Sequence, residues 1–157
     1  MRSIDLSLYL THLIPLVFLS EDDGANLLQY MQVIQVASAK AAVDKATEED
    51  IQALTKCLDD MTMESEDEEY YKRDAQFHIC LSKCSHNPLF VKSMEVTSHM
   101  LTYYLTNLVR IHGRDQSIQD HKQCLEAIIA KDNAAAMVAM HQHYSMLEQR
   151  LANSLGK

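Results

Sequence analysis

Residues 70–85 read YYKRDAQFHICLSKCS. Large apolar side chains recur in this stretch every three or four positions, a spacing that predicts an amphipathic helix with one face in the core. Two polar residues on that same face, Asp74 and His78, are one helical turn apart. A carboxylate on an apolar face is costly to bury unless a positive group compensates it. A metal ion is one such compensator, and a pair one turn apart can reach a single ion, so both residues are candidate metal ligands.

Two further histidines interrupt apolar stripes nearer the C-terminal end of the sequence. Residues 116–131 and 133–155 are predicted as helices joined by a turn around Asp132. His121 lies eleven residues before Asp132, and His143 lies eleven residues after it. In an antiparallel hairpin with a rise of about 1.5 Å per residue, both would stand about 16 Å from the turn. We therefore expect the two histidines to face the same point between the helices.

The four side chains Asp74, His78, His121 and His143 would supply one carboxylate oxygen and three imidazole nitrogens. Such a set suits one divalent metal ion, with Zn, Ni and Mn as first choices and Fe or Co also compatible. The alternative is that the histidines are hydrogen-bonded core residues, which is the commoner situation for a single histidine on an apolar stripe. Two histidines at matched height beside an Asp and His pair favour the metal. His141 is rotated by about 200° from His143 and is expected to face solvent.

The composition extends the helical prediction to the whole chain. Only three Gly and two Pro occur among 157 residues, and nine are Met, which is typical of long helices with few reversals. A domain of this length buries a core large enough to need no disulfide. The predicted fold is therefore all-α, an antiparallel bundle of about seven helices. The expected helices span about 4–19, 25–45, 47–61, 70–85, 88–111, 116–131 and 133–155.

The charge and the cysteines narrow the class of protein. The formal charge is −8 without a basic cluster, and phosphate binding depends on cationic side chains, so this chain is not expected to bind DNA or an anionic membrane directly. The apolar stretch 13–19 is interrupted by Pro15 and is too short to span a bilayer, and no signal segment is recognisable. The four cysteines, Cys57, Cys80, Cys84 and Cys124, are expected to be buried, reduced thiols. These features predict a cytoplasmic protein.

Several motifs resemble those of the ligand-binding domain of GntR-type transcription regulators, the FadR C-terminal (FCD) domain. The matching segments are DAQFH at 74–78, SHNPL at 85–89, HKQCLEAI at 121–128 and the stretch from Asp132 to His143. The resemblance extends over about residues 27–155. It implies an all-helical bundle that dimerises and binds small organic acids at a metal held by one aspartate and three histidines. By motif position these ligands are Asp74, His78, His121 and His143, the same four that the apolar stripes select.

The resemblance also implies a mechanism and a domain organisation. Binding of a small-molecule effector at the metal would change the grip of an N-terminal winged helix-turn-helix on DNA. That domain is not recognisable in this chain, so DNA would be bound only through a missing domain. Residues 1–23 are expected to form a linker or packing helix, and residues 24–157 are expected to form the effector-binding domain of a homodimer.

Two positions on each of two predicted helices depart from the family pattern. The family usually has an Arg and a Glu four residues apart, where this sequence has Met31 and Gln35. Arginines that are common on a later helix are replaced by Ser98 and Thr102. Because an arginine that would pair with an effector carboxylate is missing there, these four residues are expected to contact a less charged or differently oriented effector.

Two other functions are compatible with the same residues. A helical metalloenzyme could use this ligand set, although no Glu-x-x-His pair recurs as it does in two-metal carboxylate bundles. A structural dimerisation module would need no metal, and its histidines would be core residues. An effector sensor without catalytic activity is the preferred interpretation.

Overall fold

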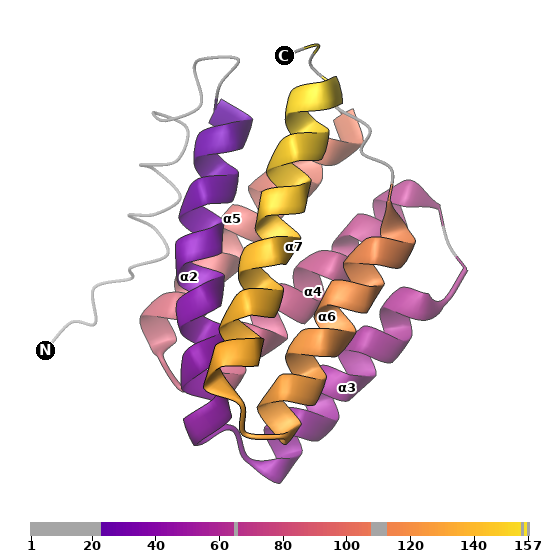
Figure 1. Ribbon diagram of the computed structural model, residues 1–157. Helices are drawn as coiled ribbons and strands as arrows, with labels where there is room; N and C mark the ends of the chain where they lie inside the picture. Colours follow the sequence, from indigo (N-terminus) through magenta and orange to yellow (C-terminus); the bar gives the residue numbers. More distant parts are fainter. Residues whose placement is uncertain (1–22, 65, 108–112, 155, 157) are drawn as a thin grey trace, which may run out of the picture.

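The computed structural model describes residues 23–64, 66–107, 113–154 and 156. These residues form α-helices and no strand (Figure 1), which confirms the all-α prediction. The helices are α2 (Asp23–Lys45), α3 (Glu48–Thr62), α4 (Asp67–Cys84), α5 (Pro88–Asn107), α6 (Arg114–Ile129) and α7 (Asn133–Ser154). They match six of the seven predicted helices, and the first predicted helix, over about 4–19, lies outside the described residues.

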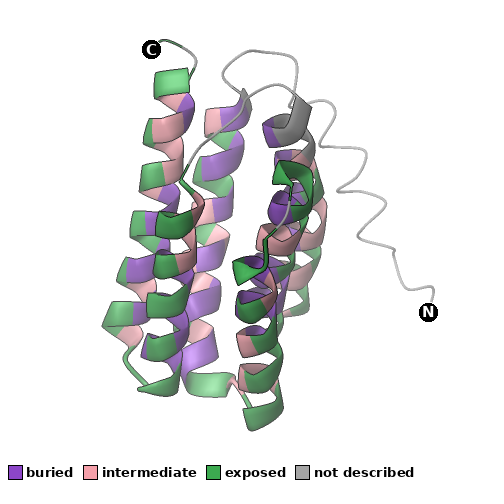
Figure 2. Ribbon diagram, turned by 90° about the vertical axis from the view of Figure 1, so that its right-hand side faces the viewer, coloured by how far each residue is buried: buried purple, intermediate pink, exposed green. Residues whose placement is uncertain are grey.

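The helices pack lengthwise into a bundle in which α2 contacts α4, α5, α6 and α7. Helix α7 packs between α2 and α6, while α4 contacts α5, α3 and α2. Figure 2 shows the buried residues on the inward faces of the helices and the exposed residues on their outer faces. The largest fully buried side chains include Leu28, Leu54, Phe77, Leu81, Ile128, Met140 and Tyr144. None of the described helices is both long enough and apolar enough to cross a membrane.

Polar residues in the first turn fix where α3 and α4 begin. Thr47 Oγ1 accepts a hydrogen bond from the Asp50 backbone N–H at 3.2 Å, and Asp50 Oδ2 accepts one from the Thr47 N–H at 2.9 Å. This reciprocal capping box satisfies two N–H groups that have no partner inside α3. Helix α4 begins at Asp67, three residues before the predicted start, and the acidic residues 67–69 form an exposed first turn. Their negative charges are favoured there by the helix dipole.

The turn between α6 and α7 aligns the two late histidines. Lys131 adopts a left-handed conformation with φ 58°, which ends α6. Asp132 Oδ1 then accepts a hydrogen bond from the Ala135 N–H at 2.9 Å and caps α7. The prediction of a turn around Asp132 is therefore confirmed, and α6 and α7 run antiparallel from it (Figure 1).

Candidate metal centre

Three helices bring four potential metal ligands to one point in the core. Helix α4 carries Asp74 and His78, α6 carries His121 and α7 carries His143. The three histidines are 0–4% exposed and Asp74 is 16% exposed. One donor atom from each residue lies within 4.8 Å of the donor atoms of the other three. The structure thus brings together the four side chains that the sequence selected, whereas His141, on the opposite side of α7, is exposed.

The imidazole rings form a compact group. The ring centroids are 4.5 Å apart for His121 and His143, 4.8 Å for His78 and His121, and 5.1 Å for His78 and His143. Phe77, a buried member of the hydrophobic core, stacks on the His121 ring with the two ring centroids 4.2 Å apart.

Several nitrogen atoms in this group have no hydrogen-bond partner among the described residues. They are Nδ1 and Nε2 of His121 and Nε2 of His143. Asp74 lies 3.7 Å from His78 Nε2 and 3.8 Å from His121 Nε2, too far for a hydrogen bond. Buried polar atoms are nearly always paired in native proteins, so this concentration of unpaired nitrogens beside a buried carboxylate is consistent with a cation between them.

Gln35 fixes the orientation of the His78 ring. Its Nε2 donates to the His78 carbonyl at 3.2 Å and to Ser82 Oγ at 2.8 Å, which turns its Oε1 toward His78 Nδ1 at 2.9 Å. An amide oxygen only accepts, so His78 Nδ1 carries the proton and donates it. The lone pair of His78 Nε2 therefore points to the cluster, as a metal ligand requires.

Asp120 lies beside the other ring nitrogen of His143, at a longer distance, and it was not predicted from the sequence. Asp120 Oδ2 lies 3.6 Å from His143 Nδ1, and Asp120 Oδ1 accepts a hydrogen bond from Gln116 Nε2 at 2.8 Å. Burial by itself would raise the pKa of Asp120, but the interactions with His143 and Gln116 hold that pKa below its usual value. A carboxylate on one ring nitrogen directs the other nitrogen, here Nε2, toward a metal.

Burial controls the protonation of the cluster. It lowers the pKa of His78 and His121 well below 6.5, and the neighbouring histidines lower both further. Burial also raises the pKa of Asp74 to about 6, against the opposing effects of His143 and of a hydrogen bond from Ser117. Above pH 6 Asp74 is therefore a buried carboxylate beside the neutral imidazoles of His78 and His121, and metal ligands bind a divalent cation in these deprotonated forms.

Two hollows flank the four ligands and share Asp74 in their walls. The first lies between α2, α4 and α5, and it is lined by Met31, Ser98 and Thr102 together with Asp74 and His78. The Oγ of Ser98 is buried without a hydrogen-bond partner among the described residues. Three of the four expected effector contacts thus line this hollow. The fourth, Gln35, is fully buried behind His78.

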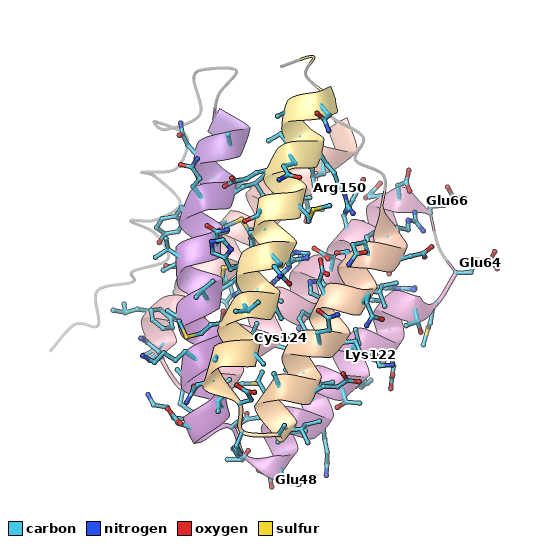
Figure 3. All side chains as sticks on the ribbon, in the orientation of Figure 1. Glu48, Glu64, Glu66, Lys122, Cys124 and Arg150 are labelled. Carbon is cyan, nitrogen blue, oxygen red and sulfur yellow. The ribbon has the colours of Figure 1, made fainter. Side chains whose placement is uncertain are left out.

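The second hollow contains two cationic side chains that the sequence analysis missed. Its walls contain Ser117, Arg114 and Arg150 as well as Asp74 and His143. Arg150 follows His143 by seven residues, which is about two helical turns, and Figure 3 labels it toward the end of α7. Arg114 is in α6 and Arg150 is in α7. Spacing within one helix could therefore not predict that both side chains line the same hollow.

Comparison with known proteins identifies the family. A family model described as the FCD domain matches residues 26–146. The chain is an FCD domain. It is 31% identical over 135 residues to the Uxu operon transcriptional regulator of Escherichia coli strain K12, with 80% of this chain and 52% of that protein covered. It is also 27% identical over 143 residues to the HTH-type transcriptional regulator LutR of Bacillus subtilis strain 168, with 87% of this chain and 65% of LutR covered.

A solved structure supports the FCD fold. A GntR-family transcriptional regulator from Pseudomonas syringae pv. tomato strain DC3000 superimposes with a TM-score of 0.69 at 15% identity, over 88% of this chain and 59% of that one. The FCD domain therefore spans between about half and two-thirds of the length of these relatives. They are transcriptional regulators and not enzymes, in agreement with the preferred interpretation of the sequence.

Proposed function

We propose that this FCD domain is the effector-sensing part of a GntR-type regulator and that it holds one divalent cation through Asp74, His78, His121 and His143. The observation that carries the proposal is the group of unpaired imidazole nitrogens around a buried carboxylate, with all donor atoms within 4.8 Å of one another. Donor atoms bound at about 2.1 Å to one ion are themselves about 3–4 Å apart. Small side-chain movements would therefore suffice to close the site on an ion.

The donor set limits the choice of cation. Three nitrogens and one oxygen are borderline ligands that suit Zn, Ni or Mn better than Ca or Mg. The bound cation would supply a Lewis acid to which oxygen atoms of an effector could bind. Gln35 and Asp120, each beside the second nitrogen of a ligand histidine, would keep the two rings oriented for that role.

A small organic acid is the effector class that the surroundings favour. Met31, Ser98 and Thr102 provide an uncharged wall on one side of Asp74, whereas Arg114 and Arg150 provide positive charge on the other side. We infer that the acid is oriented with its charged end away from α2 and toward Arg150. In this orientation Arg150 would take the role of the arginine that the family usually has at the position of Met31.

The effector signal would pass through α2. Helix α2 contributes Met31 to the first hollow and packs against α4 and α7, which carry three of the four ligands. It begins at Asp23, where the segment 1–23 that was predicted as a linker or packing helix ends. We propose that occupancy of the hollow shifts α2 and thereby a separate DNA-binding domain, in a cytoplasmic homodimer.

The metal proposal is tested by elemental analysis of protein purified without a histidine tag and then dialysed against Zn, Ni or Mn. One tightly held ion per chain is expected. His121→Ala should abolish loading because it removes one of the four proposed ligands, whereas His141→Ala, which removes an exposed histidine of α7, should not. Circular dichroism checks that each variant remains helical. Wild-type protein that retains no ion would leave only a structural role for the cluster.

The effector proposal is tested by titrating the loaded protein with malate and lactate, two hydroxy acids that differ by one carboxylate. Malate should bind more tightly, and Arg150→Gln should weaken malate roughly 10- to 100-fold while it changes lactate little, since charge-assisted hydrogen bonds contribute about 1.5–3 kcal/mol. Lys122→Gln, an exposed change on α6, is the matched control. Equal malate affinities of wild type and Arg150→Gln, or no binding of either acid to loaded protein, would refute the proposed orientation of the acid. Neither result would contradict the metal proposal.

A further inference from the structure

A pair of cysteines lies between α3 and α4, apart from the candidate metal centre. The Sγ atoms of Cys57 and Cys80 are 2.8 Å apart, although both residues are free thiols. This separation is less than 1 Å longer than the bond of about 2.05 Å in a disulfide. Two thiols on different helices are thus already positioned to be joined with little movement of either side chain.

The four cysteines of the chain are not equivalent. Cys57 and Cys80 are 9% and 8% exposed, whereas Cys84 is 2% and Cys124 is 0% exposed. The two thiols of the close pair are therefore the ones that a small reagent reaches most readily. Gln76 Nε2 also donates to Cys80 Sγ at 3.5 Å, which holds that sulfur in a defined position.

We propose that Cys57 and Cys80 form a reversible disulfide when the protein meets a hydroperoxide. One of the two thiols would attack the peroxide, forming a sulfenic acid and releasing an alcohol, or water when the oxidant is hydrogen peroxide. The second thiol would then attack the sulfenic sulfur, forming the S–S bond and releasing water. The two electrons go to the peroxide O–O bond, and a thiol reductant restores both thiols by exchange.

The disulfide would fasten α3 to α4, the helix that carries Asp74 and His78. It would close a loop between positions separated by 23 residues. A cross-link over a loop of that size restricts the unfolded chain and is expected to raise Tm by roughly 5–15 °C for a domain of this length. Oxidation would therefore leave the bundle intact and make it more resistant to unfolding.

The test uses the full chain treated with hydrogen peroxide, quenched with an alkylating agent and digested without reduction. Mass spectrometry should find the peptide containing Cys57 linked to that containing Cys80, with a loss of two hydrogen atoms. Dithiothreitol should separate the two peptides. The oxidised protein should melt at a higher temperature than the reduced protein, and Cys57→Ala should abolish both the link and the shift.

Cys84→Ala is the matched control because Cys84 is one turn from Cys80 on the same helix and should leave the link unchanged. The wild-type measurement alone decides the proposal if a variant fails to fold. A dominant link that involves Cys84 or Cys124, oxidation to sulfinic acid without a link, or thiols that stay fully reduced under peroxide would each overturn it.

Discussion

The three histidines of the candidate centre differ in what holds their rings. Gln35 accepts a hydrogen bond from the His78 Nδ1, and Asp120 lies beside the His143 Nδ1. The His121 ring is held by stacking on Phe77 instead, and neither of its nitrogens has a hydrogen-bond partner among the described residues. Substitutions behind each ring should therefore have different effects on metal affinity.

Asp120→Asn is expected to weaken metal binding without removing a ligand. An amide in place of the carboxylate loses the negative charge beside His143 Nδ1, and loss of such a partner typically lowers metal affinity roughly 10- to 100-fold. Competition with a chromophoric chelator would measure the change. Asp115→Asn, an exposed substitution on the same helix, should leave the affinity unchanged. Equal affinities for both variants would show that Asp120 does not orient His143.

The buried ionisable groups predict how the cation-free protein responds to pH. His78 and His121 have pKa values lowered well below 6.5, so they stay neutral in the folded state while the unfolded chain protonates both as the pH falls through 6.5. Unfolding then takes up protons, so the free energy of unfolding decreases as the pH is lowered. Asp74 acts in the opposite direction, because its pKa is raised to about 6 and the folded state takes up that proton first.

The two histidines outweigh the single carboxylate by about one proton below pH 6. The free energy of unfolding should therefore fall by about 1.4 kcal/mol per pH unit there. Urea titrations of chelator-treated protein at a series of pH values would measure this slope. A free energy of unfolding that stays level between neutral and mildly acidic pH would contradict it.

At the scale of helices, the start of α3 offers a test of stability that is separate from the site. Thr47→Ala removes the hydroxyl that accepts from the Asp50 N–H, and loss of such a cap costs about 1 kcal/mol. Tm should fall by roughly 2–4 °C, with metal content unchanged. A differential scan with elemental analysis of the same sample checks both. Loss of the ion in this variant would mean that α3 supports the centre more directly than its contacts indicate.

Helical periodicity explains why the four donors could be predicted from sequence and their supporting residues could not. Asp74 and His78 follow the spacing of one helix face, and His121 and His143 are related by a turn that Asp132 marks. Asp120, in contrast, is adjacent to His121 and therefore points about 100° away from it. Which neighbour it meets depends on how α6 and α7 pack together, and no pattern within a single helix contains that information.

The role of Gln35 also could not be predicted from the sequence. It is a polar residue on an inward face, and the family pattern made it a candidate effector contact. In the structure its three hydrogen bonds go to His78 and Ser82. The contact could be recognised only once the packing of α2 on α4 was known.

At the scale of the whole molecule, the cation should stabilise the bundle. A ligand that binds only the folded state at a free concentration 1,000 times its Kd adds about 4 kcal/mol, which corresponds to roughly 10 °C in Tm for a domain of this size. Thermal melting before and after treatment with a chelator, followed by readdition of the ion, would measure the effect. His141→Ala should show the full shift, and an unchanged Tm in wild type would argue against a stabilising cation.

The order of the donors along the chain has a consequence for biosynthesis. Asp74, His78 and His121 precede the α6 and α7 turn, but His143 follows it. A nascent polypeptide that has reached Asp132 therefore has three of the four donors and lacks α7, against which α2 and α6 pack. We expect ion capture to occur only after α7 has emerged from the ribosome. A peptide truncated at Asp132 should accordingly retain no ion under conditions in which the complete chain does.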